Sequence, residues 1–141
     1  MKKKSITITT LWMVGLLVFA FAGCGKKAPP IPPGAPDLPP VSALAYTIQK
    51  DVVTLTWKAP EGKAAKDLAG YTVLRSTTSL DEKECPGCPL LFERSATLGA
   101  TATSYSETLV KGKRYIYKVT AFTSYKATSR DSTLIRFEYK G

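Results

Sequence analysis

The most regular feature of the chain is an alternation of side-chain types between Lys113 and Phe122. One set of alternate positions is apolar, and the other set is mostly polar, with Ile116 and Phe122 as apolar exceptions. A period of two places successive side chains on opposite faces, so this stretch predicts a β-strand with one buried face. Residues 109–112 precede it and are typical of a turn. The expected inward side chains are Tyr115, Tyr117, Val119 and Ala121, and the expected outward ones are Arg114, Lys118 and Thr120.

Further strand signals recur between residue 41 and the C-terminus, separated by Gly, Pro or polar residues. One of them places Val53, Leu55 and Trp57 on one face and ends at a turn signal around Pro60. No segment has a convincing helical period. Short strands at regular spacing predict an all-β sandwich, here a single domain over 41–141. The expected strands cover residues 42–48, 52–57, 70–75, 90–94, 104–106, 113–122 and 133–139.

The first 23 residues differ in character from the rest. A short basic run, Lys2 to Lys4, precedes an apolar stretch from Ile6 to Ala22. A basic start, an apolar middle and small residues before a cleavage point are typical of a secretory signal. We therefore predict a cleaved signal peptide over 1–23. An uncleaved transmembrane helix, which needs roughly 17–25 apolar residues, and a signal cut elsewhere are the alternatives.

The end of this stretch, Phe21-Ala22-Gly23-Cys24, resembles the lipobox of bacterial lipoproteins, with Phe21 where Leu is usual. The resemblance implies cleavage before Cys24, diacylation of its thiol by chains such as palmitate, and acylation of the new amino group. Several acyl chains give a stable membrane anchor, whereas one chain binds only reversibly. Gly25 replaces the Asp that retains such proteins in the inner membrane of enteric bacteria. The resemblance therefore implies a lipid anchor in the cell envelope, with the outer membrane as the expected location.

The lipidated cysteine is expected to open a proline-rich tether over 24–40, which holds seven of the ten prolines. Proline fits neither a helix interior nor a central strand and favours extended polyproline II, at about 3.1 Å per residue. We predict a semi-rigid spacer, and a docking motif for a proline-binding groove is the alternative. Residues 24–30 also resemble a family of very short lipoproteins that assist assembly of the outer-membrane lipopolysaccharide-transport complex. That resemblance, which departs at Ala28, implies a role as an assembly factor.

The strand motifs resemble fibronectin type III domains over residues 38–141. The resemblance implies a seven-stranded immunoglobulin-like sandwich with Trp57, Tyr71, Tyr115 and Tyr117 in its core. It also implies a tyrosine corner, in which the Tyr115 hydroxyl bonds to backbone near Leu109. The loop over 123–132 lacks the Arg-Gly-Asp of integrin-binding members, so integrin adhesion is not expected. The matching motifs are Val53-x-Leu55-x-Trp57, Pro60, Gly70-Tyr71-x-Val73 and Leu109-x-x-Gly112-x-x-Tyr115-x-Tyr117-x-Val119-x-Ala121.

An insertion over 76–89 departs from that pattern and carries Cys85 and Cys88. With Cys24 lipidated, an exported chain keeps an even cysteine count, and an oxidising compartment favours a structural disulfide. A redox pair is the second possibility, although such pairs place the first cysteine at a helix N-terminus. A metal site shared between chains, or an intermolecular bond, is the third.

Composition excludes several function classes. The sequence has no His, which rules out Ser-His-Asp and Cys-His catalysis and imidazole-bound metals. From Cys24 onward, 17 Lys plus Arg stand against 11 Asp plus Glu, a net charge of +6, and the basic residues are scattered. Nucleic acid is therefore not an expected partner.

These observations predict a lipid-anchored, non-enzymatic binding or structural module without cofactor or metal. Its expected partners are the membrane, through Cys24, and an envelope protein or glycan. The two alternative functions are a thiol-disulfide protein that uses Cys85 and Cys88, and an assembly factor for an outer-membrane complex.

Overall fold

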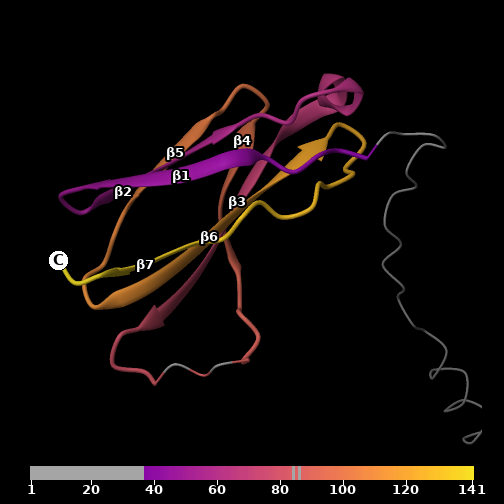
Figure 1. Ribbon diagram of the computed structural model, residues 1–141. Coiled ribbons are helices and arrows are strands. Elements are labelled where there is room, and N and C mark those ends of the chain that lie inside the picture. Colours follow the sequence, from indigo (N-terminus) through magenta and orange to yellow (C-terminus); the bar gives the residue numbers. More distant parts are fainter. Residues whose placement is uncertain (1–36, 84, 86) are drawn as a thin grey trace, which may run out of the picture.

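The computed structural model describes residues 37–83, 85 and 87–141. In this part of the chain two antiparallel β-sheets pack face to face (Figure 1). The predicted all-β, seven-stranded sandwich is therefore confirmed. One sheet has the order β1 (Ser42–Gln49), β2 (Val52–Lys58), β5 (Ser104–Thr108), and the other has the order β4 (Glu93–Gly99), β3 (Leu68–Ser79), β6 (Lys113–Thr123), β7 (Ile135–Tyr139).

The fourth strand lies later in the chain than the sequence pattern predicts. The expected strand over 90–94 begins only at Glu93 and continues to Gly99. Its side chains that pack against the core are Ala96 and Leu98, whereas Leu91 is 82% exposed. The apolar run at 90–92 is compatible with a buried strand, but its pattern alone does not show whether another layer covers it. This is why the predicted strand begins too early.

The third strand is also longer than predicted, and a short helix that the sequence did not predict precedes it. β3 continues to Ser79 because Thr77 and Thr78 pair with β6, although they are polar. The connection between β3 and β4, called the insertion below, therefore covers residues 80–92. A short 3₁₀ helix, η1 (Lys63–Asp67), joins β2 to β3, and a single turn of this kind is too short to produce a helical period.

The hydrophobic core lies between the two sheets. The four residues that the sequence places there, Trp57, Tyr71, Tyr115 and Tyr117, are all buried in it. The Trp57 and Tyr71 rings meet edge to face, with their centroids 5.4 Å apart. Leu38 belongs to the same core, so packing against the sandwich begins inside the segment that the sequence analysis assigned to the tether.

An aromatic stack closes the edge of the sandwich where β1 faces β7. The ring of Tyr46 stacks on Phe137 with centroids 4.8 Å apart, and Phe137 in turn lies 5.6 Å from Tyr115 and 6.0 Å from Tyr117. Offset aromatic pairs add to the stability that burial alone gives. Because β1 and β7 belong to different sheets, the stack joins the two sheets along this edge.

Two buried serines extend the sheet beyond β7. The backbone N–H of Val119 donates to Ser132 Oγ (2.9 Å), while the N–H of Ser132 donates to the Val119 carbonyl (3.0 Å). Ser129 and Ala121 repeat the same exchange at 3.0 and 2.8 Å. The hydroxyls therefore satisfy β6 amides that no strand partner reaches, as buried backbone groups require.

The turns at one end of the sandwich bond to one another. The N–H of Leu109 donates to the Asp51 carbonyl, and the N–H of Leu80 donates to the carbonyl of Gly112. Gly112 itself donates to Tyr139 near the C-terminus, and its φ of +75° is a conformation that favours glycine. The β5–β6 turn thus bonds to the start of the insertion and to the β1–β2 turn at this end, which we call the insertion pole.

The chain enters the sandwich at the opposite end. Residues 37–40 lie beside Thr128 and Arg130 of the β6–β7 connection, and the N–H of Ser124 donates to Asp67 of η1. We call this end the N-terminal pole. The described chain therefore starts at one pole, and the insertion lies at the other (Figure 1).

Gly70 is expected to tolerate no side chain. A Cβ at this position would lie 2.1 Å from the Leu98 carbonyl oxygen and 2.8 Å from the Phe122 ring. Gly70→Ala would force β4 and Phe122 apart, and overpacking of this kind costs about 1–3 kcal/mol in the free energy of unfolding. Urea denaturation monitored by tryptophan fluorescence measures the loss.

Gly99→Ala is the matched control, because nothing lies within 4 Å of its added Cβ. Its effect should stay within about 0.5 kcal/mol. Equal destabilisation by the two substitutions would contradict the close approach at Gly70.

Candidate functional site

A carboxylate occupies an inward position of the sandwich. Glu107 of β5 pairs with Val53 of β2 in the sheet register, so it lies on the face that otherwise holds apolar residues. Its side chain is only 14% exposed. A buried carboxylate is unfavourable unless it is paired and hydrogen-bonded, so its partners decide whether it is tolerated.

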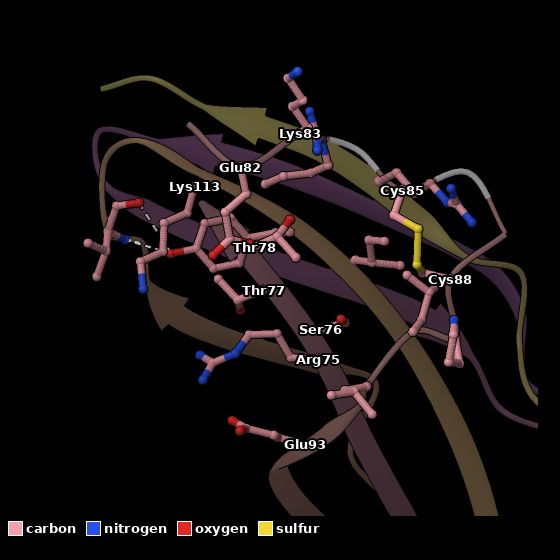
Figure 2. Close-up of a pocket in the computed structure, with 18 of the residues that line it drawn as sticks. Arg75, Ser76, Thr77, Thr78, Glu82, Lys83, Cys85, Cys88, Glu93 and Lys113 are labelled. Atoms are coloured by element: carbon pink, nitrogen blue, oxygen red, sulfur yellow. Dashed lines mark hydrogen bonds between the residues drawn. A yellow bond between two sulfur atoms is a disulfide. The ribbon is translucent and has the colours of Figure 1, made fainter. Parts of the chain in front are cut away.

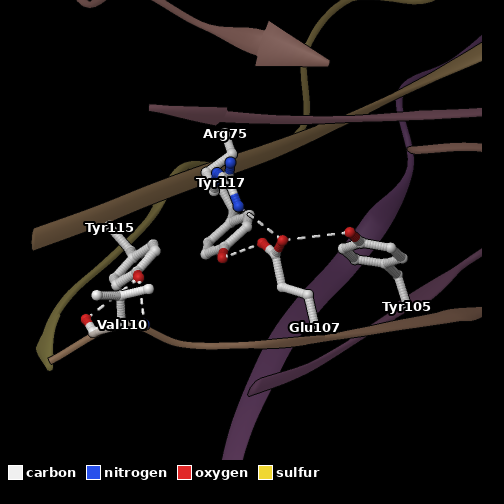
Figure 3. A network of polar contacts seen from close by, with 6 residues as sticks. All are labelled: Arg75, Tyr105, Glu107, Val110, Tyr115 and Tyr117. Carbon is white, nitrogen blue, oxygen red and sulfur yellow. Dashed lines mark hydrogen bonds and ion pairs between the residues drawn. The ribbon is translucent and has the colours of Figure 1, made fainter. Parts of the chain in front are cut away.

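Three side chains surround this carboxylate (Figure 3). One Glu107 oxygen accepts from the Arg75 guanidinium at 2.7 Å and from the Tyr105 hydroxyl at 3.3 Å. The other oxygen accepts from the hydroxyl of Tyr117. Arg75 and Tyr117 belong to β3 and β6, whereas Glu107 and Tyr105 belong to β5. The network therefore joins the two sheets through polar contacts next to the aromatic stack.

The environment of this network changes the acidity of the tyrosines. Burial, followed by the hydrogen bond and the charge of Glu107, raises the pKa of Tyr117 far above its ordinary value. Burial and the same carboxylate also raise the pKa of Tyr105. Burial raises the pKa of Tyr71, which lies elsewhere in the core. All three hydroxyls therefore keep their protons at neutral pH, where Tyr105 and Tyr117 act as hydrogen-bond donors.

Tyr115 forms a contact with the turn that precedes β6. Its hydroxyl accepts from the N–H of Val110 at 2.8 Å and donates to the Val110 carbonyl at 3.3 Å. The fibronectin type III resemblance implies a tyrosine corner with a bond near Leu109, and the structure places both bonds one residue further on. The hydroxyl fixes the turn that leads into β6 at the insertion pole.

The insertion is closed by a disulfide. Cys85 and Cys88 are bonded to each other, and the N–H of Cys88 donates to the Cys85 carbonyl at 3.1 Å. Both residues are exposed. Within residues 37–83, 85 and 87–141 the one helical element is η1, at the other pole, so the pair does not have the helix N-terminus that activates redox cysteines.

The insertion packs over the outward face of β6. Ile116, the apolar exception on that face, is only 6% exposed, and it lines a groove together with insertion residues. Lys118 lies over the Phe92 ring, with its Nζ 4.2 Å from the centroid. The insertion therefore explains one of the two apolar exceptions to the alternation over 113–122, because it covers Ile116 on the outward face of β6.

A groove of about 1130 Å³ separates the insertion from the sandwich (Figure 2). The sandwich side comes from the end of β3, the turn at 108–110 and the start of β6, together with Arg136. The insertion side includes Lys83, the disulfide and the two leucines at 90 and 91. At its base the buried Thr77 hydroxyl has no hydrogen-bond partner within the described residues.

Some of the predicted features lie outside the described residues. Cys24, the signal peptide over 1–23 and nearly all of the tether over 24–40 belong to this group. In the part of the chain that the structure describes, no helix is long and apolar enough to cross a membrane. The same part contains no group of three His, Cys, Asp or Glu residues that could hold a metal ion.

The sequence analysis did not identify Glu107 or Arg75. Both follow the period of two set by their neighbours. Tyr105 and Glu107 alternate in β5 and Leu109 continues their row just after it, while Tyr71, Val73 and Arg75 alternate in β3. Two opposite charges that continue apolar rows on separate strands are a signal for an ion pair between sheets. The predicted strand over 104–106 ends before Glu107, so the sequence pattern alone does not place this carboxylate on a strand.

Comparison with known proteins matches the fold. No family model matches the sequence. No curated protein matches it either. An Fn3-like protein from Clostridium thermocellum is 22% identical, with a TM-score of 0.53, and the match covers 75% of this chain and 97% of that one. This chain has a fibronectin type III-like fold. The predicted sandwich type is therefore confirmed.

Two further matches are to parts of longer chains. The twitchin kinase region from C. elegans is 18% identical with a TM-score of 0.59, and the match covers 75% of this chain and 17% of that one. Pectate lyase PelI from Erwinia chrysanthemi, in complex with tetragalacturonic acid, is 26% identical with a TM-score of 0.53, and the match covers 68% and 27%. The fibronectin type III-like module recurs in unrelated proteins, and such likeness establishes architecture and not activity.

Removal of the inward carboxylate is expected to destabilise the sandwich. Glu107→Leu leaves the Arg75 charge and the Tyr117 hydroxyl without their partner in a mostly dry site. Loss of one member of a buried pair costs about 3–5 kcal/mol, and because the Arg75 side chain is 30% exposed we expect about 2–3 kcal/mol. Chemical denaturation measures the change.

A double-mutant cycle provides the control. Arg75→Met combined with Glu107→Leu replaces the pair by apolar groups, and the double variant should be more stable than Glu107→Leu alone. Additive losses would show that the ion pair does not couple the sheets.

The buried tyrosines also predict a pH dependence. The unfolded chain releases phenolic protons above about pH 10, whereas the folded chain keeps those of Tyr71, Tyr105 and Tyr117. The folded state therefore binds more protons, and its stability should fall as pH rises above that value. Tyrosinate absorbance should show these three of the seven tyrosines ionising at higher pH in the folded protein than in the unfolded chain.

Tyr117→Phe removes one of the three phenols, so the number of protons released in the high-pH ionisation step should fall by one. If all seven tyrosines ionise together while the circular dichroism spectrum stays native, the burial of these hydroxyls is wrong.

Proposed function

We propose that this chain is a lipid-anchored protein of a bacterial cell envelope, in which the sandwich is a non-catalytic binding or structural module. The observation that carries the proposal is the order of features at the N-terminal end. A lipobox-like sequence ends at Cys24, a proline-rich segment follows, and the chain enters the sandwich at Leu38. Anchoring at Cys24 is the inference that connects these three features.

The two-pole arrangement supports this proposal. The segment from Cys24 reaches the sandwich at the N-terminal pole, so an anchor there leaves the insertion pole directed away from the membrane surface. Residues 24–36, in an extended polyproline II conformation, would span on the order of 40 Å before the chain reaches the sandwich. The tether would then hold the module clear of lipid headgroups and present the insertion to other envelope components.

A non-catalytic role agrees with the chemistry of the polar network. Glu107, the carboxylate of the network, accepts hydrogen bonds from Arg75, Tyr105 and Tyr117, and it lies between the sheets. These contacts make it a structural group that holds two layers together. Binding at the surface is therefore the role that the fold supports best, and such modules recur in proteins of many functions.

Acylation at Cys24 is the direct test. The full chain, expressed in a Gram-negative host supplied with an alkyne-bearing fatty acid, should carry the label and appear in the membrane fraction. Cys24→Ser should lose the label and keep the mass of the uncleaved signal peptide. In-gel fluorescence and intact mass spectrometry read the two properties separately.

The matched control is Cys85→Ser with Cys88→Ser, which removes the two other cysteines. It should keep the fatty-acid label at the wild-type level. An unlabelled wild-type chain, or a label that survives Cys24→Ser, would overturn the proposal.

A further inference from the structure

We propose that the bond between Cys85 and Cys88 is a reversible redox switch, which a dithiol reductant opens while the sandwich stays folded. The bond is the one covalent link within the insertion at the insertion pole (Figure 2). The proposal concerns how the surface of the module is regulated, and it does not require acylation of Cys24.

The bond is accessible to a reductant in the folded protein. Cys85 and Cys88 are both exposed, and so is Gly87 between them. A disulfide is exchanged when a thiolate attacks one of its sulfur atoms, so access controls the reaction, and exposed disulfides are the ones that serve regulatory roles. Reduction of this bond therefore does not require the sandwich to unfold.

The bond also lies outside the parts that hold the sandwich together. Among the described residues, none of those in the hydrophobic core or packed against it belongs to the insertion over 80–92. The pairing of β3 with β6 ends at Ser79, and the pairing of β3 with β4 involves Glu93 and later residues. Opening the bond therefore removes neither core packing nor strand pairing.

Within the insertion, the disulfide is the main constraint. At its start the N–H of Leu80 donates to the Gly112 carbonyl at 2.9 Å, and at its end the Phe92 ring lies under Lys118. Between 83 and 91 the described residues make one backbone hydrogen bond, from Cys88 to Cys85, which are the two residues that the disulfide joins. Few contacts besides the bond hold this stretch, and such stretches open locally at low cost.

The state of the bond changes the surface that the module presents. Ile116, on the outward face of β6, is only 6% exposed and lines the same groove as Cys88 and Leu90. An insertion that is held only at its two ends covers this side chain less completely. Reduction therefore uncovers apolar surface on β6, and exposed apolar surface is what other molecules contact.

The exchange is balanced by the reductant. A thiolate of the dithiol attacks one cysteine sulfur, the Cys85–Cys88 bond breaks, and a mixed disulfide forms. The second thiol of the reductant then displaces the bound cysteine, so the chain gains two electrons and two protons and the reductant becomes a disulfide. Since the attacking thiolate belongs to the reductant, the cysteines of this chain need no activating helix N-terminus.

The rate of reduction tests the proposal. The full chain in nonionic detergent is incubated with dithiothreitol, alkylated at intervals and digested with trypsin, and the peptide over 84–94 contains both cysteines without Cys24. We expect the native protein to be reduced within about tenfold of the rate in guanidinium chloride. A bond reached only through global unfolding would react about a thousandfold or more slowly.

Gly70→Ala is the matched control for the route of reduction. It destabilises the whole sandwich far from the disulfide, so it should raise the unfolded population by about fivefold or more. Attack on the native bond predicts the wild-type rate in this variant, whereas reduction through unfolding predicts a rate that rises by the same factor.

The reduced protein should keep its sandwich and lose order in the insertion. Its circular dichroism and the fluorescence of the buried Trp57 should stay native. Deuterium exchange over 84–94 should become about tenfold faster or more, while exchange over β6 should not change. Oxidised glutathione should restore the slow exchange, because the two thiols are linked through a short segment and re-form the bond within one chain.

Cys85→Ser with Cys88→Ser is the control for the reduced state, and its exchange over 84–94 should be fast with or without dithiothreitol. Any of three results contradicts the proposal: a rate of reduction that follows unfolding, loss of the native spectrum on reduction, or equal exchange over 84–94 in both redox states. None of them involves Cys24, so the acylation and reduction experiments can fail independently.

Discussion

The burial of one row of side chains on β6 is the constraint on which the rest of this sandwich depends. Tyr117, Val119 and Ala121 are completely buried, and they lie between the facing sheets while their backbones pair with β3. Several neighbouring contacts support this row. The Tyr115 hydroxyl fixes the turn before it, two serines complete its hydrogen bonds, and Phe137 stacks on its tyrosines.

The architecture could be predicted from the sequence because it depends on periodicity. Alternation over 113–122 indicates a strand with one buried face without any knowledge of the strands beside it. The alternation of Val53, Leu55 and Trp57 indicates β2 in the same way. The strand ends could not be predicted with the same accuracy. Thr77 and Thr78 are paired because β6 is long enough to reach them, and Leu91 is exposed because the insertion turns away from the core.

The polar network and the groove were beyond the sequence analysis for a related reason. A hydrogen bond between Arg75 and Glu107 spans 32 positions and depends on the facing of two sheets, which the pattern of a single strand does not contain. The groove likewise arises from residues of the insertion, β3, β6 and β7, which are separated in sequence. The sequence shows the cysteine motif, but it does not show that the disulfide-bonded insertion lines one side of a groove.

The two poles have a mechanical consequence. A pull between the segment before Leu38 and the insertion runs roughly along the strands, because the chain enters at one pole and the insertion projects from the other (Figure 1). Tension in that direction loads the hydrogen bonds of a strand pair together as shear, whereas a pull across the sheet would open them one after another. The same fold that presents a surface is therefore arranged to resist extension along its length.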